Sequence, residues 1–360
     1  MYSVGLIPLL TAFLGALVLT PLTIRVAISR GWVDKPGERK IHRRPLPRLG
    51  GISVFLSLWG AWFLFAFLEP DHVPYEARTQ IWALFGASTL VWILGLYDDL
   101  VGANAWQKLA VQVVAACFAV GSGIQIKLLL NPVGLDDLFL SPFWSWVLSV
   151  AWIVFVSNAI NLIDGLDGLA GGVCCITALS IYFISKELGS PYLPFLSLAI
   201  AGACLGFLFF NFQPARIFLG DSGALTLGFL LACVSLMGAT KRSTAIVMFG
   251  PPLILALPLA DSCLAIVRRL KRGGLPDLTL GHIFRRLREV FQADQEHIHH
   301  GLLKIGLSHR HAVVLLYLVT SLLGLTAYRH SVGNHLASTV ITFFVLATAL
   351  AWLRSRAKRN

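Results

Sequence analysis

The strongest constraint on this chain is the recurrence of apolar runs, each about 20 residues long, from one end to the other. A helix of that length crosses the hydrocarbon core of a bilayer. The composition agrees, because 56% of the 360 residues are hydrophobic, only 13% are charged, and the mean hydropathy is +0.75. These values exclude a typical soluble domain and a disordered chain. The sequence therefore predicts an all-α polytopic membrane protein rather than a β-barrel, whose segments would alternate over roughly ten residues.

We place about eleven transmembrane helices in a single domain that covers residues 1–360. The first run, Val4–Ala27, lacks the charged start and the cleavage site of a signal peptide, so it is expected to be a span. Pro251, Pro252 and Pro258 predict a bend or a break in the ninth helix. The expected spans are 4–28, 50–68, 79–97, 106–122, 144–162, 168–185, 192–210, 223–239, 244–267, 312–328 and 335–353.

The distribution of basic residues predicts the orientation of these spans. Most of the 29 Lys and Arg residues lie in alternate loops, above all in 29–49, 268–310 and the C-terminal RSRAKRN. The side rich in Lys and Arg is cytoplasmic, which puts the N-terminus outside and the C-terminus inside. The net charge of +11 then faces anionic lipid headgroups and anionic cytosolic substrates. A nucleic-acid partner is not expected, because the chain has no compact soluble basic domain.

Under this topology, unusual polar residues gather at the cytoplasmic ends of the spans. They occur in four separate inner segments, within LYDDLVG and the QKL that follows it, NAINLIDGLDG, NFQPARIFLGDSGAL and EHIHHG. The last of these lies in the long cytoplasmic loop 268–311. Convergence of four segments is a stronger indication of a site than any one motif. The residues are Asp98, Asp99, Lys108, Asn158, Asn161, Asp164, Asp167, Asn211, Asp221, His297, His299 and His300.

Each motif also has an ordinary structural interpretation. Asp98 and Asp99 are compatible with a solvated helix end. GDSG at 220–223 stands where a helix starts, so it could be a simple N-cap, or a metal-binding carboxylate beside N–H groups that face a phosphate. The six cysteines show no C-x-x-C spacing and are interpreted as small packing residues within spans.

The stretch 158–167 carries a polar residue at every third position. On a helix each step of three residues turns the face by about 60°, so Asn161 and Asp164 are neighbours whereas Asn158 and Asp167 point apart. The glycines nearby favour a broken or re-entrant turn that brings these groups to one cavity. An ordinary polar turn between helices is the alternative. The glycines are Gly165, Gly168, Gly171 and Gly172.

The histidines favour a substrate-binding loop. His297 and His300 share a helical face, and His299 does not. A zinc site is one alternative, but three histidines without cysteine in an arginine-rich loop fit phosphate or sugar binding better. A solvated loop is the other alternative.

Several carboxylates with amides, a lysine and basic loops suit magnesium-assisted phosphoryl transfer. Mg²⁺ prefers a few carboxylate oxygens, with water and substrate phosphates completing its shell. The chain contains no G-x-x-x-x-G-K-[ST], G-x-S-x-G or H-E-x-x-H motif, so a Walker ATPase, an α/β-hydrolase or a zincin is unsupported.

The ordered set of motifs resembles the polyprenyl-phosphate N-acetylhexosamine-1-phosphate transferases, glycosyltransferase family 4. The motifs KIHRRPLPRLGG, LYDDLVG followed by QKL, NAINLIDGLDGLAGG, FNFQPARIFLGDSGAL and HIHH appear in that order over nearly the whole chain. Among the branches of this superfamily, HIHH and eleven spans resemble the UDP-GlcNAc branch more than the MurNAc-pentapeptide translocase. The resemblance implies a multi-pass enzyme of the bacterial cytoplasmic (inner) membrane, with its active site at the cytoplasmic face.

The implied reaction joins a UDP-N-acetylhexosamine to undecaprenyl phosphate, with release of UMP and formation of lipid-diphosphate-sugar. By resemblance, Asp221 is the Mg²⁺ ligand, assisted by Asn161, and Mn²⁺ is the alternative ion. Asp98 is similar to the proposed base, with Asp99 and Lys108 beside it as catalytic residues. A phosphate monoester has a second pKa of about 6, so little deprotonation is needed at neutral pH, and we expect Asp98 and Lys108 mainly to position the lipid phosphate and the metal.

The resemblance also assigns the donor pocket. Asp164 organises the diphosphate, and Asp167, Asn211 and Phe218 form the uridine pocket, with Phe218 stacked on uracil. The remaining substrate-binding residues are Arg43, Asn158, His297, His299 and His300.

The sequence departs from the family pattern where sugar recognition is expected. Gln295 and Gly301 stand where many members of this branch carry basic residues, and GGLPDLTLGHIFRRLREVFQ is a long insertion-like stretch. The exact sugar is therefore left open, with a modified acetamido sugar or UDP-MurNAc-pentapeptide as alternatives to UDP-GlcNAc. An ion-coupled transporter and a non-catalytic scaffold are the alternatives from other classes. The sequence leaves the oligomeric state open, a homodimer included.

Overall fold

The computed structural model describes residues 4–34, 45–126, 128–129, 138–239, 252–272 and 298–332. Within these ranges, eight helices are long and apolar enough to cross a membrane. The prediction of an all-α, multi-pass membrane protein is confirmed at this level. The eight helices are α1 (Ile7–Ser29), α2 (Gly50–Leu68), α3 (Tyr75–Leu100), α5 (Pro142–Ile163), α6 (Leu169–Glu187), α7 (Leu193–Asn211), α8 (Gly220–Ala239) and α13 (His309–Val332).

Shorter elements connect or flank these helices. The short β-ladders are antiparallel, and β1 places Val33 opposite Pro47 and Asp34 opposite Leu46 of β2. The other elements are η1 (Val4–Leu6), η2 (Pro70–His72), α4 (Ala105–Gly121), α10 (Ala256–Arg272), α12 (Ile298–Lys304), and the strands β1 (Val33–Asp34), β2 (Leu46–Pro47), β3 (Leu128–Leu129) and β4 (Leu138–Phe139).

The predicted spans agree with the observed helices to within a few residues from α1 to α8 and at α13. In the predicted ninth span, the chain turns at Leu255 before α10 begins, which fits the break expected from the prolines there. The last predicted span, 335–353, lies outside the described residues. The total of eleven therefore stays a prediction.

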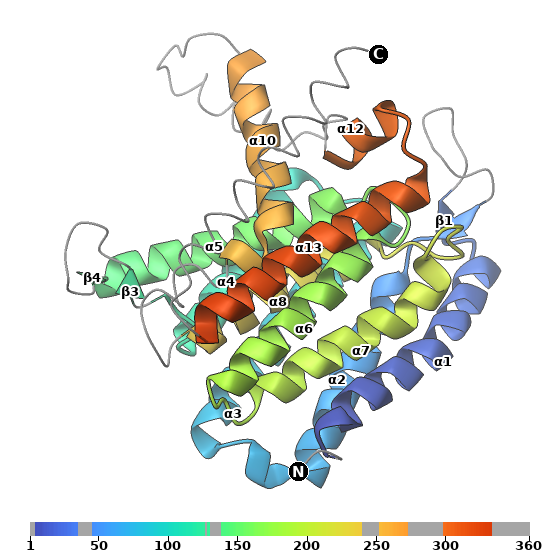
Figure 1. The fold of residues 1–360 in the computed structure, drawn as a ribbon. Coiled ribbons are helices and arrows are strands. Elements are labelled where there is room, and N and C mark those ends of the chain that lie inside the picture. Colours follow the sequence, from blue (N-terminus) through green and yellow to red (C-terminus); the bar gives the residue numbers. More distant parts are fainter. Residues whose placement is uncertain are drawn as a thin grey trace.

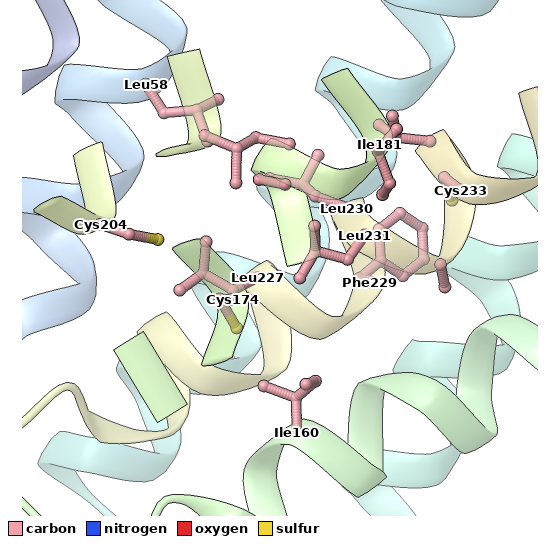
Figure 2. Close-up of a cluster of buried hydrophobic side chains, with 14 of the residues drawn as sticks. Leu58, Ile160, Cys174, Ile181, Cys204, Leu227, Phe229, Leu230, Leu231 and Cys233 are labelled. Atoms are coloured by element: carbon pink, nitrogen blue, oxygen red, sulfur yellow. The ribbon is translucent and has the colours of Figure 1, made fainter. Parts of the chain in front are cut away.

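Helix α8 forms the centre of the bundle. Buried residues make up 94% of its most apolar 18-residue window, against 28% for α1. It packs against α2, α3, α5, α6 and α7, and an all-round apolar sequence is typical of a helix in that position. Figure 2 shows its side chains, among them Leu227 and Phe229, in one buried cluster with Leu58 of α2 and Ile160 of α5. Cys174, Cys204 and Cys233 are buried in the same cluster, as expected of packing residues.

Four helices, α13, α6, α7 and α1, lie side by side along one flank of the molecule (Figure 1). Close packing of α7 on α1 depends on Gly202 and Gly206, one turn apart. A Cβ at either position would overlap a backbone carbonyl of α1, at Leu9 or Phe13. Small residues of this kind let membrane helices approach closely.

Glycines also let α2 and α3 pack closely against the first turn of α8. A Cβ added at Gly51 of α2 or Gly95 of α3 would overlap atoms of Ser222. The ends of α2 and α3 therefore pack directly on the backbone where α8 begins. This contact places the polar residues at the end of α3 beside that first turn.

We expect Gly95→Ala to lower the free energy of unfolding by about 2 kcal/mol, because the new methyl group collides with backbone that cannot move aside cheaply. Gly60→Ala on α2 is the control, since nothing lies within 4 Å of a Cβ there. Thermal unfolding in detergent compares the two. Equal melting temperatures for both variants would contradict the tight contact.

Candidate active site

A polar cavity of about 330 Å³ opens at the end of the bundle where α8 begins and where α5 and α7 end. This volume is within the usual range for a small-molecule pocket. Its walls come from segments far apart in the sequence, which the bundle brings to one place. The lining residues are Asp34, Arg48, Asn161, Asp164, Gly165, Leu166, Asp167, Asn211, Phe218, Gly220 and Asp221.

The first turn of α8 is held by Asp99, the second aspartate of LYDDLVG. Its Oδ1 accepts the N–H of Asp221 at 2.9 Å, and its Oδ2 accepts the N–H and the hydroxyl of Ser222 at 3.0 and 2.7 Å. The first N–H groups of a helix have no partner within the helix, and a carboxylate there also interacts favourably with the helix dipole. Asp99 is thus the cap of α8, and the side chain of Asp221 is free for another role.

Asp221 instead meets Lys108. The Lys108 Nζ lies 2.6 Å from Asp221 Oδ2 and 2.7 Å from Asp98 Oδ2, so one ammonium group bridges two carboxylates. The other oxygen of Asp98 accepts the N–H of Ala103 at 2.7 Å. Helix α4, which carries Lys108, begins with a capping box formed by Asn104 and Gln107. The Asp98–Ala103 bond and the capping box thus fix the end of α3 and the start of α4. They position Lys108 for its contact with Asp221, more than a hundred residues away in the sequence.

The break predicted in NLIDGLDGLAGG lies between α5 and α6. Helix α5 ends at Ile163 and α6 begins at Leu169, with Gly168 at a φ of +81° that favours glycine. The turn leaves Asn161, Asp164 and Asp167 on the wall of one cavity, as the sequence indicated. Two of the four glycines have another role, because Gly171 and Gly172 are buried helical residues of α6.

Asp164 lies in the turn, outside the spans, among other acidic groups. Burial raises its pKa to about 8, and the negative charges of Asp221 and Asp99 add to the shift. Arg48, which also lines the cavity, acts in the other direction. A cation that entered the cavity would favour the ionised carboxylate.

Hydrogen bonds between two loops build the wall that carries Phe218. Asn211 is only 2% exposed. Its Oδ1 accepts the N–H of Gly168 at 3.0 Å, and its Nδ2 donates to the carbonyl of Ile217 at 2.9 Å. Asp167 Oδ2 accepts the N–H of Ala215 at 3.1 Å. Asn211 and Asp167 thus join the turn after α5 to the loop before α8.

Among the polar residues of the stretch 158–167, Asn158 lies outside the polar cavity. It is absent from the cavity lining, and its Nδ2 donates to Gln112 Oε1 at 2.6 Å. Both this amide and Asn161 lie on α5, and the turn of about 60° between them carries Asn158 to another side of the helix. There it lines a separate apolar groove beside α4.

The histidine loop cannot be compared in the same way. Arg43 and His297 lie outside the described residues. His299 and His300 fall on the backbone of α12, and their side chains lie outside the described residues. Their predicted roles stay predictions.

Two charged lining residues, Asp34 and Arg48, were not singled out from the sequence. The β1–β2 ladder carries Asp34 to the cavity, and Arg48 follows this ladder directly before α2. Arg48 could have been found from its place in the motif KIHRRPLPRLGG, but only Arg43 of that motif was predicted to bind substrate.

The described residues contain no cage of three His, Cys, Asp or Glu side chains. Mg²⁺ does not need one, because it is usually held by one or two carboxylates together with substrate phosphates and water. Asp221, Asp164 and the amide of Asn161 supply oxygen ligands around one cavity. The donor set therefore fits a Mg²⁺ ion that binds together with a phosphorylated substrate.

A polar, acidic cavity at one end of an apolar helical bundle defines a membrane protein that handles a polar molecule at the bilayer surface. Comparison with known sequences identifies the family. Residues 81–239 match the model of glycosyl transferase family 4. These residues span α3 to α8, apart from the start of α3, and contain most of the cavity.

Three curated relatives extend this match to most of the chain. A probable undecaprenyl-phosphate N-acetylglucosaminyl 1-phosphate transferase of Bacillus subtilis is 34% identical over 88% of this chain and 82% of its own length. A decaprenyl-phosphate N-acetylglucosaminephosphotransferase of Mycobacterium tuberculosis is 37% identical over 82% and 75%. An undecaprenyl-phosphate alpha-N-acetylglucosaminyl 1-phosphate transferase of Escherichia coli is 28% identical over 90% and 83%. The chain belongs to the polyprenyl-phosphate N-acetylhexosamine-1-phosphate transferases of glycosyl transferase family 4.

The capping role of Asp99 predicts a loss of stability in Asp99→Ala. The variant leaves two N–H groups and a hydroxyl unpaired in a buried place, so we expect about 2–3 kcal/mol less stability, measured by thermal unfolding. Asp98→Ala is the matched control, because Asp98 makes no hydrogen bond to the backbone of α8 in the described structure. An equal loss for both variants would argue against a specific cap.

The raised pKa of Asp164 predicts a pH dependence of stability in EDTA. The folded chain holds this proton up to about pH 8, whereas the unfolded chain releases it near pH 4. The contribution of Asp164 is complete below about pH 4 and is lost as the pH rises to about 8, by at most about 1.4 kcal/mol per pH unit. Unfolding midpoints of Asp164→Asn should fall less steeply with pH than those of the wild type, and parallel curves would refute the shift.

Proposed function

We propose that this enzyme transfers N-acetylglucosamine 1-phosphate from UDP-GlcNAc to undecaprenyl phosphate or a similar polyprenyl phosphate, with release of UMP. The observation that carries this proposal is the meeting of Asp98, Lys108 and Asp221 beside a polar cavity. The names of the relatives support the same acceptor class and the same sugar.

The polar cavity suits the donor nucleotide. Arg48 supplies a positive charge for the diphosphate, and Phe218 supplies an aromatic ring for uracil. Asp167 and Asn211 shape the wall that carries Phe218, through the hydrogen bonds described above. The histidine loop is expected to reach the sugar from the cytoplasmic side.

The donor's diphosphate calls for a divalent cation. Asp221 and Asn161 would hold Mg²⁺, or Mn²⁺ as an alternative, with Asp164 close by on the same wall. When bound, the ion neutralises the charge that grows on the diphosphate as UMP departs. Lys108 carries its positive charge to the same place from α4, where it also orients the carboxylate of Asp221.

A second feature suits the lipid acceptor. An apolar groove of about 510 Å³ runs between α4, α5 and α10, and its lining is almost wholly hydrophobic. Val113 of α4 belongs to this groove and lies five residues, about 7.5 Å, along the helix from Lys108. In this proposal, an isoprenoid chain lies in the groove with its phosphate directed toward the Lys108 ammonium group. The groove is lined by Val113, Cys117, Trp146, Val147, Val150, Ala151, Val154, Phe155, Asn158 and Ile266.

The transfer itself is a displacement at phosphorus. An oxygen of the lipid phosphate forms a bond to the sugar-linked phosphorus of the donor, and the bond from that phosphorus to the UMP oxygen breaks. Because the second pKa of a phosphate monoester is about 6, the attacking oxygen is already ionised at neutral pH. Asp98 then acts mainly by holding Lys108 in place for the acceptor phosphate.

The orientation in the membrane follows from charge. The cavity lies at the ends of α3, α5 and α7 and at the starts of α2, α4, α8 and α13, which is one face of the bundle. In the sequence, the basic loop 29–49 joins α1 to α2, which starts at this face, so the positive-inside rule puts the face in the cytoplasm. We infer an external N-terminus, a cytoplasmic C-terminus and about eleven spans in the inner membrane.

The direct test is UMP release by the purified full-length protein with undecaprenyl phosphate, Mg²⁺ and a panel of UDP sugars. We expect turnover with UDP-GlcNAc, loss of turnover in EDTA, and recovery when Mg²⁺ is added back. No UMP from any sugar would refute the transferase proposal, and turnover with another sugar alone would correct the donor.

Asp221→Ala tests the metal assignment in the same assay. Loss of a metal ligand should lower kcat by about a thousandfold or more, with little change in melting temperature. Asp71→Ala, an exposed aspartate in η2 at the opposite end of the bundle, is the control and should keep full activity. Near wild-type activity of Asp221→Ala would remove Asp221 from the metal site.

A further inference from the structure

Gly168 directly follows Asp167 of the cavity wall and is held from two directions. Its N–H donates to Asn211 Oδ1 at 3.0 Å, and its carbonyl oxygen accepts the hydroxyl of Tyr317. Asn211 comes from the end of α7, and Tyr317 comes from α13. At a φ of +81°, Gly168 is the last residue of the turn before α6, so these two bonds fix the place where the turn enters α6.

The bond from Asn211 extends this restraint to the second loop of the wall. The other end of the Asn211 amide holds Ile217, next to Phe218, and Asp167 holds Ala215. The turn 164–168 and the loop 212–219 are thus linked twice, once directly through Asp167 and Ala215 and once through the amide of Asn211. A displacement of Gly168 would move the ring of Phe218 and the carboxylate of Asp167 as well.

Tyr317 acts on this wall from behind. It does not line the cavity, and its ring packs against Gly172 of α6, where a Cβ would overlap the tyrosine. Arg310, at the start of the same helix, donates from Nη2 to the carbonyl of Gln213 at 3.0 Å. Helix α13 therefore contacts both linked segments without taking part in the polar cavity.

We propose that Tyr317 is a positioning residue for the donor nucleotide. Through Gly168 and Asn211 it holds the wall that bears Asp167 and Phe218 in its binding geometry before the donor arrives. Preorganisation of this kind improves binding because less ordering is left to be done when the ligand enters. The proposal rests on the proposed function, since it names a residue that serves the UDP-sugar side of that site and leaves the lipid side untouched.

Tyr317→Phe removes only the hydroxyl. We expect KM for UDP-GlcNAc, and Kd for UMP measured by calorimetry, to rise about fivefold to tenfold, the size of one lost hydrogen bond. The KM for undecaprenyl phosphate and kcat should change by less than about twofold. Tyr328→Phe is the matched control, because its hydroxyl contacts Glu187 on the exposed side of the same helix.

A second pair of variants tests the same contact without changing Tyr317. Gly172→Ala should push the tyrosine away from Gly168 and reproduce the rise in KM, because its methyl group would occupy the position of the ring. Gly171→Ala is the neighbouring control, since a Cβ there meets Leu208 at 3.4 Å, an ordinary contact.

The outcomes separate this proposal from the proposed function. Wild-type turnover together with an unchanged donor KM and UMP Kd in Tyr317→Phe would overturn the positioning role alone. A parallel change of both KM values and kcat with a lower melting temperature would also overturn it, because that pattern indicates a general loss of structure. Absence of turnover in the wild type would refute the proposed function. The Kd for UMP would still test the positioning role of Tyr317, because calorimetry measures binding without turnover.

Discussion

The hydrogen bonds from the first turn of α8 to Asp99 are the interaction on which the rest of the site depends. A helix that begins inside a membrane protein exposes N–H groups to surroundings where water is scarce, and unpaired groups of this kind are costly. Asp99 supplies both of its oxygens from the end of α3. Gly51 and Gly95 let α2 and α3 come close enough for this contact, because any Cβ there would overlap Ser222. The capped turn then presents Asp221 to Lys108 and to the cavity.

The acidic character of the site gives a physical reason for the proposed metal ion. Four aspartates line the cavity within the described residues, against one arginine there and one lysine at its edge. Negative charges gathered in partly buried surroundings raise the energy of their ionised forms, as the raised pKa of Asp164 illustrates. In the proposed function, a divalent ion would offset these charges and would thereby let a diphosphate bind in the same cavity. The fold therefore sets the charge of the site, because it buries several carboxylates near the start of α8.

The spans and the position of the site could be predicted because they depend on local sequence. Apolar runs give helices, and the glycines of NLIDGLDGLAGG gave the break at which Asn161, Asp164 and Asp167 face one cavity. The roles of single residues were harder, because they depend on partners far away in the chain. Asp99 was predicted to be catalytic, and its bonds to α8 could not be anticipated from the dipeptide Asp98–Asp99.

Other differences have the same origin. Asn158 shares the three-residue spacing of Asn161, yet its partner Gln112 and its side of α5 place it at the apolar groove. Asn211 was assigned to the uridine pocket, and in the structure it lines the cavity with both ends of its amide bonded to backbone, a role that its position in the sequence did not indicate. Asp34 and Arg48 reach the cavity through a two-residue ladder too short to be recognised in the sequence. Spacing along the chain gave the faces of helices but not the contacts between them.

The division of labour between Asp99 and Asp221 is the central claim, and a structure of the full-length protein with Mn²⁺ and UDP tests it most directly. Anomalous scattering locates the ion without reference to the protein coordinates. We expect the ion within coordinating distance of Asp221, at roughly 2.1–2.3 Å, with Asp99 still accepting the N–H groups of Asp221 and Ser222. An ion bound to Asp99, with the start of α8 uncapped, would contradict the assignment of the two residues.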